Sequence, residues 1–200
     1  MNNYLLSIDP SIKNTGFTLW EKVKDYRDYK NNIYEEYWKP IWINSYDFKE
    51  YSTGVEISKS DYIYNNNFNY LILNQIEKEL DFQLGSKNSK SNFNLIIERG
   101  FPNMKGSETQ DHLRGFIAGQ FNKLLKKDML ISPKEWQNWY LKELRYEEDD
   151  LFKDKKWNKE KSLYIVGGLI RQQKWNITIS NHDEADSLLI GWYYLNKENK

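Results

Sequence analysis

The stretch YLLSIDPSIKNTG, residues 4–16, decides how this chain folds. Its apolar run at residues 4–8 predicts a buried strand, because the run is short, continuous and followed by Pro and Gly turn signals. Residues 17–20, Phe-Thr-Leu-Trp, predict a second strand that returns antiparallel to the first. The chain therefore begins with a hairpin whose first strand ends in a carboxylate, Asp9.

Three more acidic residues occupy comparable positions. Leu95 to Ile97 is a second short apolar run, and it ends at Glu98. In HDEADSLLIG, Asp183 and Asp186 open an apolar helical pattern, and their spacing puts both on one helix face. Strand ends deliver Asp9 and Glu98 to one edge of a sheet. Clustered carboxylates repel one another, so the sequence predicts a divalent-metal site suited to Mg²⁺ or Mn²⁺.

The rest of the chain alternates helical and strand patterns. We expect a polar insertion at 21–67 with a third strand near 40–44, a helix at 68–84, a strand at 95–97, a helix at 113–125, a strand at 129–131, a helix that starts at Pro133 after Ser132 as N-cap, a charged connection at 143–161, and helices at 161–173 and 183–195. This order predicts an α/β fold of the ribonuclease H-like type, a mixed five-stranded sheet with helices on both faces.

Size and composition bound the class of protein. The 200 residues correspond to one domain, which we expect to span 1–200. With 29 basic and 29 acidic residues the formal net charge is zero, so any basic surface for a polyanion is local. The absence of cysteine excludes disulfides and thiolate metal sites. No apolar run reaches about 18 residues and no signal-type N-terminus is present, so we expect a cytoplasmic protein without a membrane span.

Each acidic residue taken alone has a structural alternative. Asp9 could cap the turn that follows it, and Asp183 could be the N-cap of the last helix. Glu98 could pair with Arg99 or Arg114. A carboxylate at the end of an apolar strand is nevertheless costly to bury without a partner. The four acids together therefore favour a metal centre over four unrelated structural roles.

Phosphodiester hydrolysis is the chemistry that such a centre fits. Two metal ions about 3.5–4 Å apart can stabilise the attacking and leaving oxygens of an in-line displacement. We expect Asp9 to bridge the ions, with Glu98 and either Asp186 or Asp183 completing their coordination. His182 is a candidate for orienting water, for ligating metal or for acid–base work, with an ordinary helix-start histidine as the alternative. The lysines that could neutralise phosphate charge, or be plain surface lysines, are Lys105, Lys159 and Lys161.

The order and spacing of these motifs resemble the RuvC family of Holliday junction resolvases, especially its divergent phage and bacterial relatives. The matching motifs are Ile8-Asp9-Pro10-Ser11 with Thr15-Gly16, Ile96-Ile97-Glu98, Arg114 to Gly119, Pro133 to Trp136, and Asp183-Glu184-Ala185-Asp186 followed by an apolar helix. The segments 21–67 and 143–161 depart from the family by being longer, which affects substrate preference and dimer geometry.

The resemblance implies a Mg²⁺-dependent endodeoxyribonuclease that resolves four-way DNA junctions. In the family's pattern, catalysis and binding of two metal ions fall to Asp9, Glu98, Asp183 and Asp186. Phe101 matches an aromatic residue that stacks on junction bases, and we expect Arg114 and Lys105 to contact the DNA. The family also implies a homodimer whose two sites cut symmetric strands.

Other classes share parts of this pattern. A related nuclease could act on other branched DNA or on RNA. The actin and sugar-kinase superfamily has a similar first hairpin that holds nucleotide phosphates, but this chain lacks the length for a second lobe and the glycine-rich phosphate loops. A binding module without activity is the third alternative, and the presence of all four acids counts against it.

Overall fold

The computed structural model describes residues 3–11, 14–28, 33–47, 66–85, 93–100, 107–143 and 156–197. These residues form one five-stranded sheet with the order β3-β2-β1-β4-β5. The strands are β1 (Tyr4–Asp9), β2 (Asn14–Asp28), β3 (Ile33–Asp47), β4 (Phe93–Glu98) and β5 (Leu130–Ile131). Because β2 pairs antiparallel with β1 and β3 while β4 pairs parallel with β1 and β5, the sheet is mixed.

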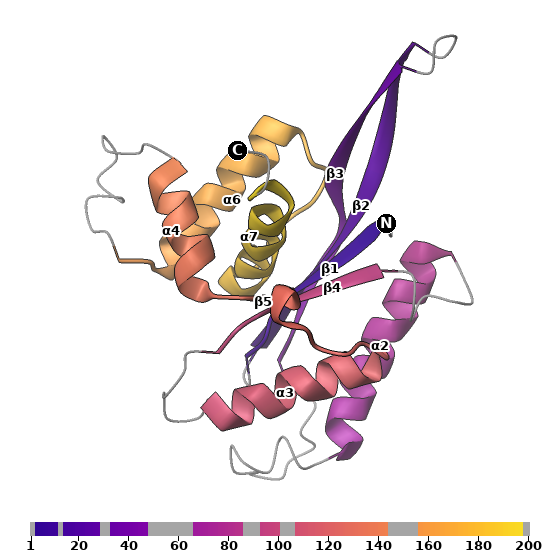
Figure 1. The fold of residues 1–200 in the computed structure, drawn as a ribbon, viewed down its shortest axis with the longest axis vertical. Helices are drawn as coiled ribbons and strands as arrows, with labels where there is room; N and C mark the ends of the chain where they lie inside the picture. Colours follow the sequence, from indigo (N-terminus) through magenta and orange to yellow (C-terminus); the bar gives the residue numbers. More distant parts are fainter. Residues whose placement is uncertain are drawn as a thin grey trace.

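Helices cover both faces of this sheet (Figure 1). They are α2 (Asn66–Leu84), α3 (Ser107–Gln120), α4 (Pro133–Glu143), α6 (Lys159–Gln173) and α7 (His182–Asn196), and a 3-10 helix, η2 (Lys127–Met129), precedes β5. Helices α2 and α3 lie on one face, and α4, α6 and α7 lie on the other. The predicted fold class is confirmed.

The two faces of the sheet enclose separate hydrophobic cores. In β1, Leu6 and Ile8 pack in the core beneath α2 and α3, whereas Leu5 packs with α4, α6 and α7. In β4, Ile97 and Ile96 divide between the two cores in the same way. This alternation explains why both strands are almost continuously apolar, since a strand covered on both faces has no solvated side.

The hairpin of β2 and β3 is longer than predicted. Residues 21–28 and 33–39, which the sequence assigned to a polar insertion, extend the two strands into an arm beyond the body of the sheet (Figure 1). Lys22 forms an ion pair with Glu36, and Lys39 Nζ lies 3.4 Å from Glu21 Oε2 across the strands. Cross-strand pairs of charged residues stabilise such a ribbon without apolar alternation, so hydrophobic patterning does not reveal it.

The remaining boundaries differ from the predicted ones by smaller amounts. Helix α3 begins at Ser107 and ends at Gln120, earlier at both ends than the expected 113–125. Helices α2, α6 and α7 each begin one or two residues earlier than expected. The rest of the predicted insertion and most of the charged connection fall outside the described residues. Of the helices that are described, none is long and apolar enough to cross a membrane.

Candidate active site

Asp9 and Glu98 lie at the ends of adjacent parallel strands. Ile8 of β1 is in register with Ile97 of β4, so the next residue of each strand is one of the two acids. Both side chains are half-buried. The two carboxylates therefore lie at the same edge of the sheet, as the sequence predicts.

The start of α7 brings the second pair of acids to the same edge. The N-cap of this helix is Asn181, whose side chain accepts the backbone N–H groups of Asp183 and Glu184, so the alternative that Asp183 is the N-cap is wrong. Asp183 Oδ2 instead accepts a hydrogen bond of 2.7 Å from Asn14 Nδ2 at the start of β2. This bond ties the helix start to the hairpin that carries Asp9.

Gly16 lets α7 approach the hairpin this closely. Gly16 is paired with Asp9 across the β1–β2 ladder. A Cβ atom at Gly16 would lie 2.0 Å from the carbonyl oxygen of Asp183, a distance that no side chain can occupy. Gly16 of the first motif is thus required by the close packing of strand and helix, which fixes how far Asp183 stands from Asp9.

A buried polar contact holds the next turn of α7 against β1 and β2. Ser7 Oγ donates to the carbonyl oxygen of Ser187 at 2.8 Å, and the hydroxyls of Thr18 and Ser187 are 2.8 Å apart. Trp20 Nε1 donates to Ser7 Oγ at 3.0 Å. Gly191 leaves room for this indole, since a Cβ there would lie 2.2 Å from Trp20 Nε1. Satisfied buried polar groups of this kind favour one register of the helix on the sheet.

The four acids interact electrostatically. Burial raises the pKa of Asp9 well above its ordinary value, and the negative charges of Glu98, Asp186 and Asp183 raise it further. Burial and the charge of Asp186 raise the pKa of Glu98 to about 7. Burial and the charge of Asp183 raise the pKa of Asp186 to about 7. Charge repulsion of this kind is what a bound cation relieves.

Two tryptophans on the sheet face that α4, α6 and α7 cover help to orient two of these carboxylates. Trp136 Nε1 on α4 donates to Glu98 Oε2 at 2.8 Å. Ser162 Oγ on α6 donates to Asp186 Oδ1 at 2.5 Å and accepts from Trp157 Nε1 at 3.1 Å. The indoles of Trp136 and Trp157 meet edge to face, with ring centroids 4.8 Å apart. Both acids are therefore held from the same aromatic cluster, a feature that the sequence analysis missed.

Arg114 supplies positive charge beneath the acids. The residue is only 3% exposed, and its Nε donates to the backbone carbonyl oxygen of Glu98 at 2.6 Å. Its Nη1 lies 3.0 Å from Asp111 Oδ1. The guanidinium lowers the pKa of Asp9 and of Glu98, against the larger effect of burial. Arg114 thus bonds Glu98 through the backbone carbonyl and acts on the Glu98 carboxylate through its charge, and the DNA contact of Arg114 stays a prediction.

The other candidate residues differ in where the structure places them. His182 Nε2 lies 3.3 Å from Asp183 Oδ1, at the margin of the acidic cluster. Lys159 is exposed and lowers the pKa of Asp186, although by less than burial raises it. Lys161 is fully buried, with its ammonium donating to the carbonyl oxygen of Lys156, so it is not a surface lysine. Phe101 and Lys105 lie outside the described residues.

Glu184, which lies between the two aspartates, has a structural role that the sequence analysis did not assign. Its side chain is 5% exposed. Its carboxylate accepts hydrogen bonds from the Ser180 backbone N–H at 2.7 Å and from Ser45 Oγ at 3.2 Å. Glu184 therefore anchors the start of α7 to β3. The only signal in the sequence was the helical spacing, which turns this residue away from the face shared by Asp183 and Asp186.

The chemistry of the donor set suits a hard divalent cation. Carboxylate oxygens are the ligands that Mg²⁺ and Mn²⁺ prefer, and four carboxylates gather at one sheet edge, where the pKa values of Asp9, Glu98 and Asp186 are raised. Within the described part of the chain, no three acidic or histidine side chains are already disposed around one metal position.

Comparisons with known proteins give the fold. No protein-family model and no curated protein match the chain. Among solved structures, Thermus thermophilus RuvC matches with 11% identity and a TM-score of 0.51 over 97% of this chain and 96% of that one. T. thermophilus RuvC in complex with Holliday junction substrate matches with 11% identity and a TM-score of 0.50 over 98% and 96% of the two chains. A Fowlpox virus resolvase bound to Holliday junction DNA matches with 14% identity and a TM-score of 0.40 over 98% and 99%. The resemblance predicted from the sequence motifs is thus confirmed for the fold: the chain has the ribonuclease H-like fold of RuvC.

Proposed function

We propose that this chain is a divalent-metal-dependent endonuclease that cuts branched DNA, with four-way junctions as the preferred substrate. The observation that carries the proposal is the convergence of Asp9, Glu98, Asp183 and Asp186 at one edge of the sheet, with mutual repulsion that a cation would relieve. The structural likeness to a RuvC that was solved with its Holliday junction substrate supports the choice of substrate.

The four acids would hold two Mg²⁺ ions, and Mn²⁺ is expected to substitute. Bound there, the ions would activate a water and neutralise charge on the phosphate. Trp136 keeps the Glu98 carboxylate pointed at the site, and Ser162 does the same for Asp186. Arg114 limits the repulsion from within the protein. Water reaches the half-buried acids at the sheet edge, where a scissile phosphate would also bind.

The proposal includes a homodimer and contacts from residues beyond those described. Two copies related by a two-fold axis would give a four-way junction two matched cuts. Phe101 and Lys105 follow Glu98 closely in the chain and remain our candidates for base stacking and phosphate contact. A cross-linking or light-scattering measurement with and without junction DNA tests the dimer.

A cleavage assay tests the activity. Wild-type protein with Mg²⁺ should cut a labelled four-way junction into two nicked duplexes, while Asp9→Asn and Glu98→Gln should bind the junction but leave it intact. Parallel reactions with a flap, a plain duplex and a structured RNA measure selectivity. Preferential cutting of the RNA or the flap would replace the junction as substrate. If no substrate is cut across a range of salt and metal, the nuclease proposal is wrong.

A further inference from the structure

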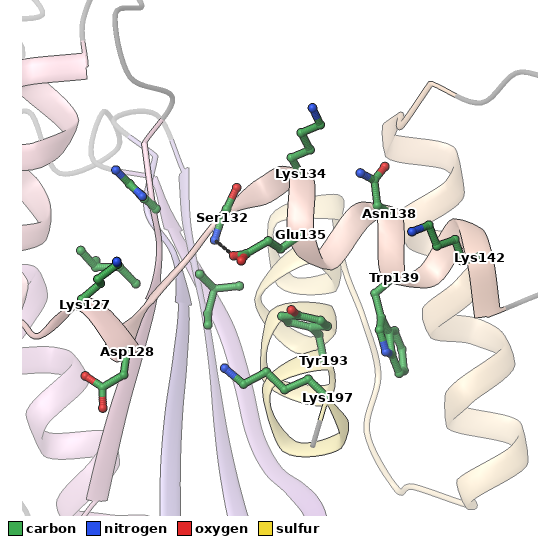
Figure 2. A pocket seen from close by; sticks show the side chains of 13 residues that line it. Lys127, Asp128, Ser132, Lys134, Glu135, Asn138, Trp139, Lys142, Tyr193 and Lys197 are labelled. Carbon is green, nitrogen blue, oxygen red and sulfur yellow. Dashed lines mark hydrogen bonds between the residues drawn. The ribbon is translucent and has the colours of Figure 1, made fainter. Parts of the chain in front are cut away.

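An open cavity of about 1000 Å³, whose lining includes none of the four acids, lies between α4, β5 with its preceding 3-10 helix, and the C-terminal part of α7 (Figure 2). Its basic lining residues are Arg99, Lys127, Lys134, Lys142 and Lys197, and its acidic ones are Asp128 and Glu135. Because the formal net charge of the whole chain is zero, five basic against two acidic residues is a local concentration of positive charge.

One of the two acids already serves the fold. Glu135 Oε2 accepts the backbone N–H of Ser132 at 3.0 Å, a bond that Figure 2 shows, and so stabilises the first turn of α4. The start of α4 also contributes the positive end of its helix dipole to this side of the cavity. Trp139 and Tyr193 add aromatic surface to the lining. The cavity thus combines positive charge with aromatic groups.

The cavity begins next to the candidate active site. Arg99 directly follows Glu98, and its backbone N–H continues the ladder by donating to the carbonyl oxygen of Ile131 at 2.7 Å. Helix α4 contacts Glu98 through Trp136 and lines the cavity at Lys134 and at later positions. A strand of nucleic acid that lies across Glu98 can therefore continue along this helix.

The path from the acids past the cavity is long enough for several phosphates. Helix α7 carries Asp186 at the acidic cluster and is followed by Lys197 at the far side of the cavity. With a rise of 1.5 Å per residue, the helix between them is roughly 16 Å long. DNA carries one phosphate per strand for about every 3.4 Å along its axis. A DNA duplex that runs from the acids along α7 would place roughly four or five phosphates of one strand along this path.

We infer that this cavity binds the phosphodiester backbone of the substrate nucleic acid on the side of the scissile bond that faces α4. The inference rests on the proposed function, because it takes the acids as the cutting point. The lysines of the cavity contact phosphate and carry no base specificity, so they strengthen binding of any nucleic-acid duplex that reaches them. The site would position the duplex and leave the chemistry to the four acids.

Charge removal at the cavity tests this inference against a matched control. The variant K127Q/K134Q/K142Q removes three exposed cations from the lining, and K78Q/R171Q/K174Q removes three exposed cations elsewhere. Binding of a fluorescent four-way junction is measured in EDTA over a range of NaCl, so that no cleavage occurs. We expect binding by the cavity variant to be about tenfold weaker or more near 0.1 M salt, with a shallower salt dependence, and binding by the control to stay within about twofold of wild type.

Equal affinities of the two variants would overturn the inference. So would a cavity variant that binds the junction normally but loses stabilisation by ATP or pyrophosphate, because the cavity would then hold a free phosphate ligand. The proposed function is judged separately, by Mg²⁺-dependent cutting in the wild type. A wild type that binds junctions without cutting them defeats the nuclease proposal, whereas a cutting wild type with indistinguishable variants defeats only the cavity.

Discussion

Trp136 donates its indole N–H to the carboxylate of Glu98 across 2.8 Å, linking the first core helix after β5 to the acid at the end of β4. This bond lowers the pKa of Glu98, against the larger effect of burial. It therefore favours the ionised form that a metal ion requires. The indole sets both the direction and the charge of the carboxylate.

Removing this donor should weaken metal binding. In Trp136→Phe the ring is largely replaced but the N–H is lost, so we expect the Mg²⁺ concentration for half-maximal cleavage to rise about three- to tenfold, with a smaller change at saturating Mg²⁺. Trp175→Phe is the matched control, since Trp175 packs against Trp20 and Trp192 in the same core. Identical Mg²⁺ curves for Trp136→Phe and wild type would show that the bond has no part in metal binding.

Ser162 should matter to Asp186 in the same way. Its hydroxyl donates to Asp186 Oδ1, and this bond lowers the pKa of Asp186. Ser162→Ala should therefore shift the lower limb of the cleavage–pH profile toward higher pH, because the acid ionises later. Ser162→Thr keeps a hydroxyl and should restore the wild-type profile if the extra methyl group fits. A profile that moves equally in both variants would point to disturbed packing of α6 instead.

Gly16 should be intolerant of any side chain. Gly16→Ala places a methyl group at 2.0 Å from the Asp183 carbonyl oxygen, so α7 must move away from the hairpin. We expect a loss of about 2–3 kcal/mol in the free energy of unfolding, by analogy with overpacked cores, and loss of cleavage. Gly119→Ala on α3 is the control. Apart from the neighbouring backbone of α3 itself, no atom lies within 4 Å of a Cβ there, and alanine in a helix should be neutral or stabilising by up to about 1 kcal/mol.

The sequence was sufficient to predict which acids lie at the strand ends, but not which side chains contact them. Asp9 and Glu98 could be placed because short apolar runs that end in an acid are visible without any knowledge of contacts. The Trp136–Glu98 bond joins residues 38 positions apart. Its geometry depends on how α4 packs on the sheet, which no local pattern encodes. Lys161 was misjudged for the same reason, since its burial follows from packing rather than from its polarity.

The outer half of the β2–β3 hairpin was missed for a different reason. Patterning detects a strand through the contrast between a buried and a solvated face. The arm beyond the sheet is held by charged pairs such as Lys22 with Glu36, so that contrast is weak there. The abundance of Lys, Asp, Asn and Tyr in this segment therefore resembled a polar insertion. The start of helix α3 was placed too late because its first residues, Ser-Glu-Thr-Gln-Asp, are polar and give no apolar periodicity.

Stability without metal should fall as the pH rises. The pKa of Glu98 is about 7 in the folded protein against an ordinary value of 4.5. Between these values the folded state keeps a proton that the unfolded chain has lost. This stabilisation is complete below about pH 4.5 and is lost as the pH rises through 7. In EDTA we expect the wild type to lose on the order of 1–2 kcal/mol over this range relative to Glu98→Gln, as measured by denaturant unfolding. Parallel pH curves for the two proteins would contradict the raised pKa.

Adding Mg²⁺ should reverse this trend. Metal binds the ionised carboxylates, so the thermal midpoint at pH 8 should rise with Mg²⁺ in the wild type and much less in Asp9→Asn. The comparison needs no substrate and so tests the metal site independently of cleavage. A midpoint that is insensitive to both Mg²⁺ and Mn²⁺ would speak against the site.

Substitutions at the adjacent residues Glu184 and Asp183 should have different effects, the first on stability and the second on cleavage. Glu184→Gln keeps the shape of the side chain but weakens the bonds from Ser45 and Ser180, so we expect a loss of about 1–2 kcal/mol in stability with near-normal cleavage at a temperature where the protein stays folded. Asp183→Asn should do the opposite. Because it removes negative charge from the cluster of repelling carboxylates, stability without metal should be unchanged or higher. Cleavage should drop by at least about a hundredfold, as expected for a lost metal ligand. Unfolding curves and junction cleavage measured on the same preparations distinguish the two. If Glu184→Gln lost cleavage while remaining fully folded, Glu184 would belong to the catalytic group, and the assignment based on helix faces would be wrong.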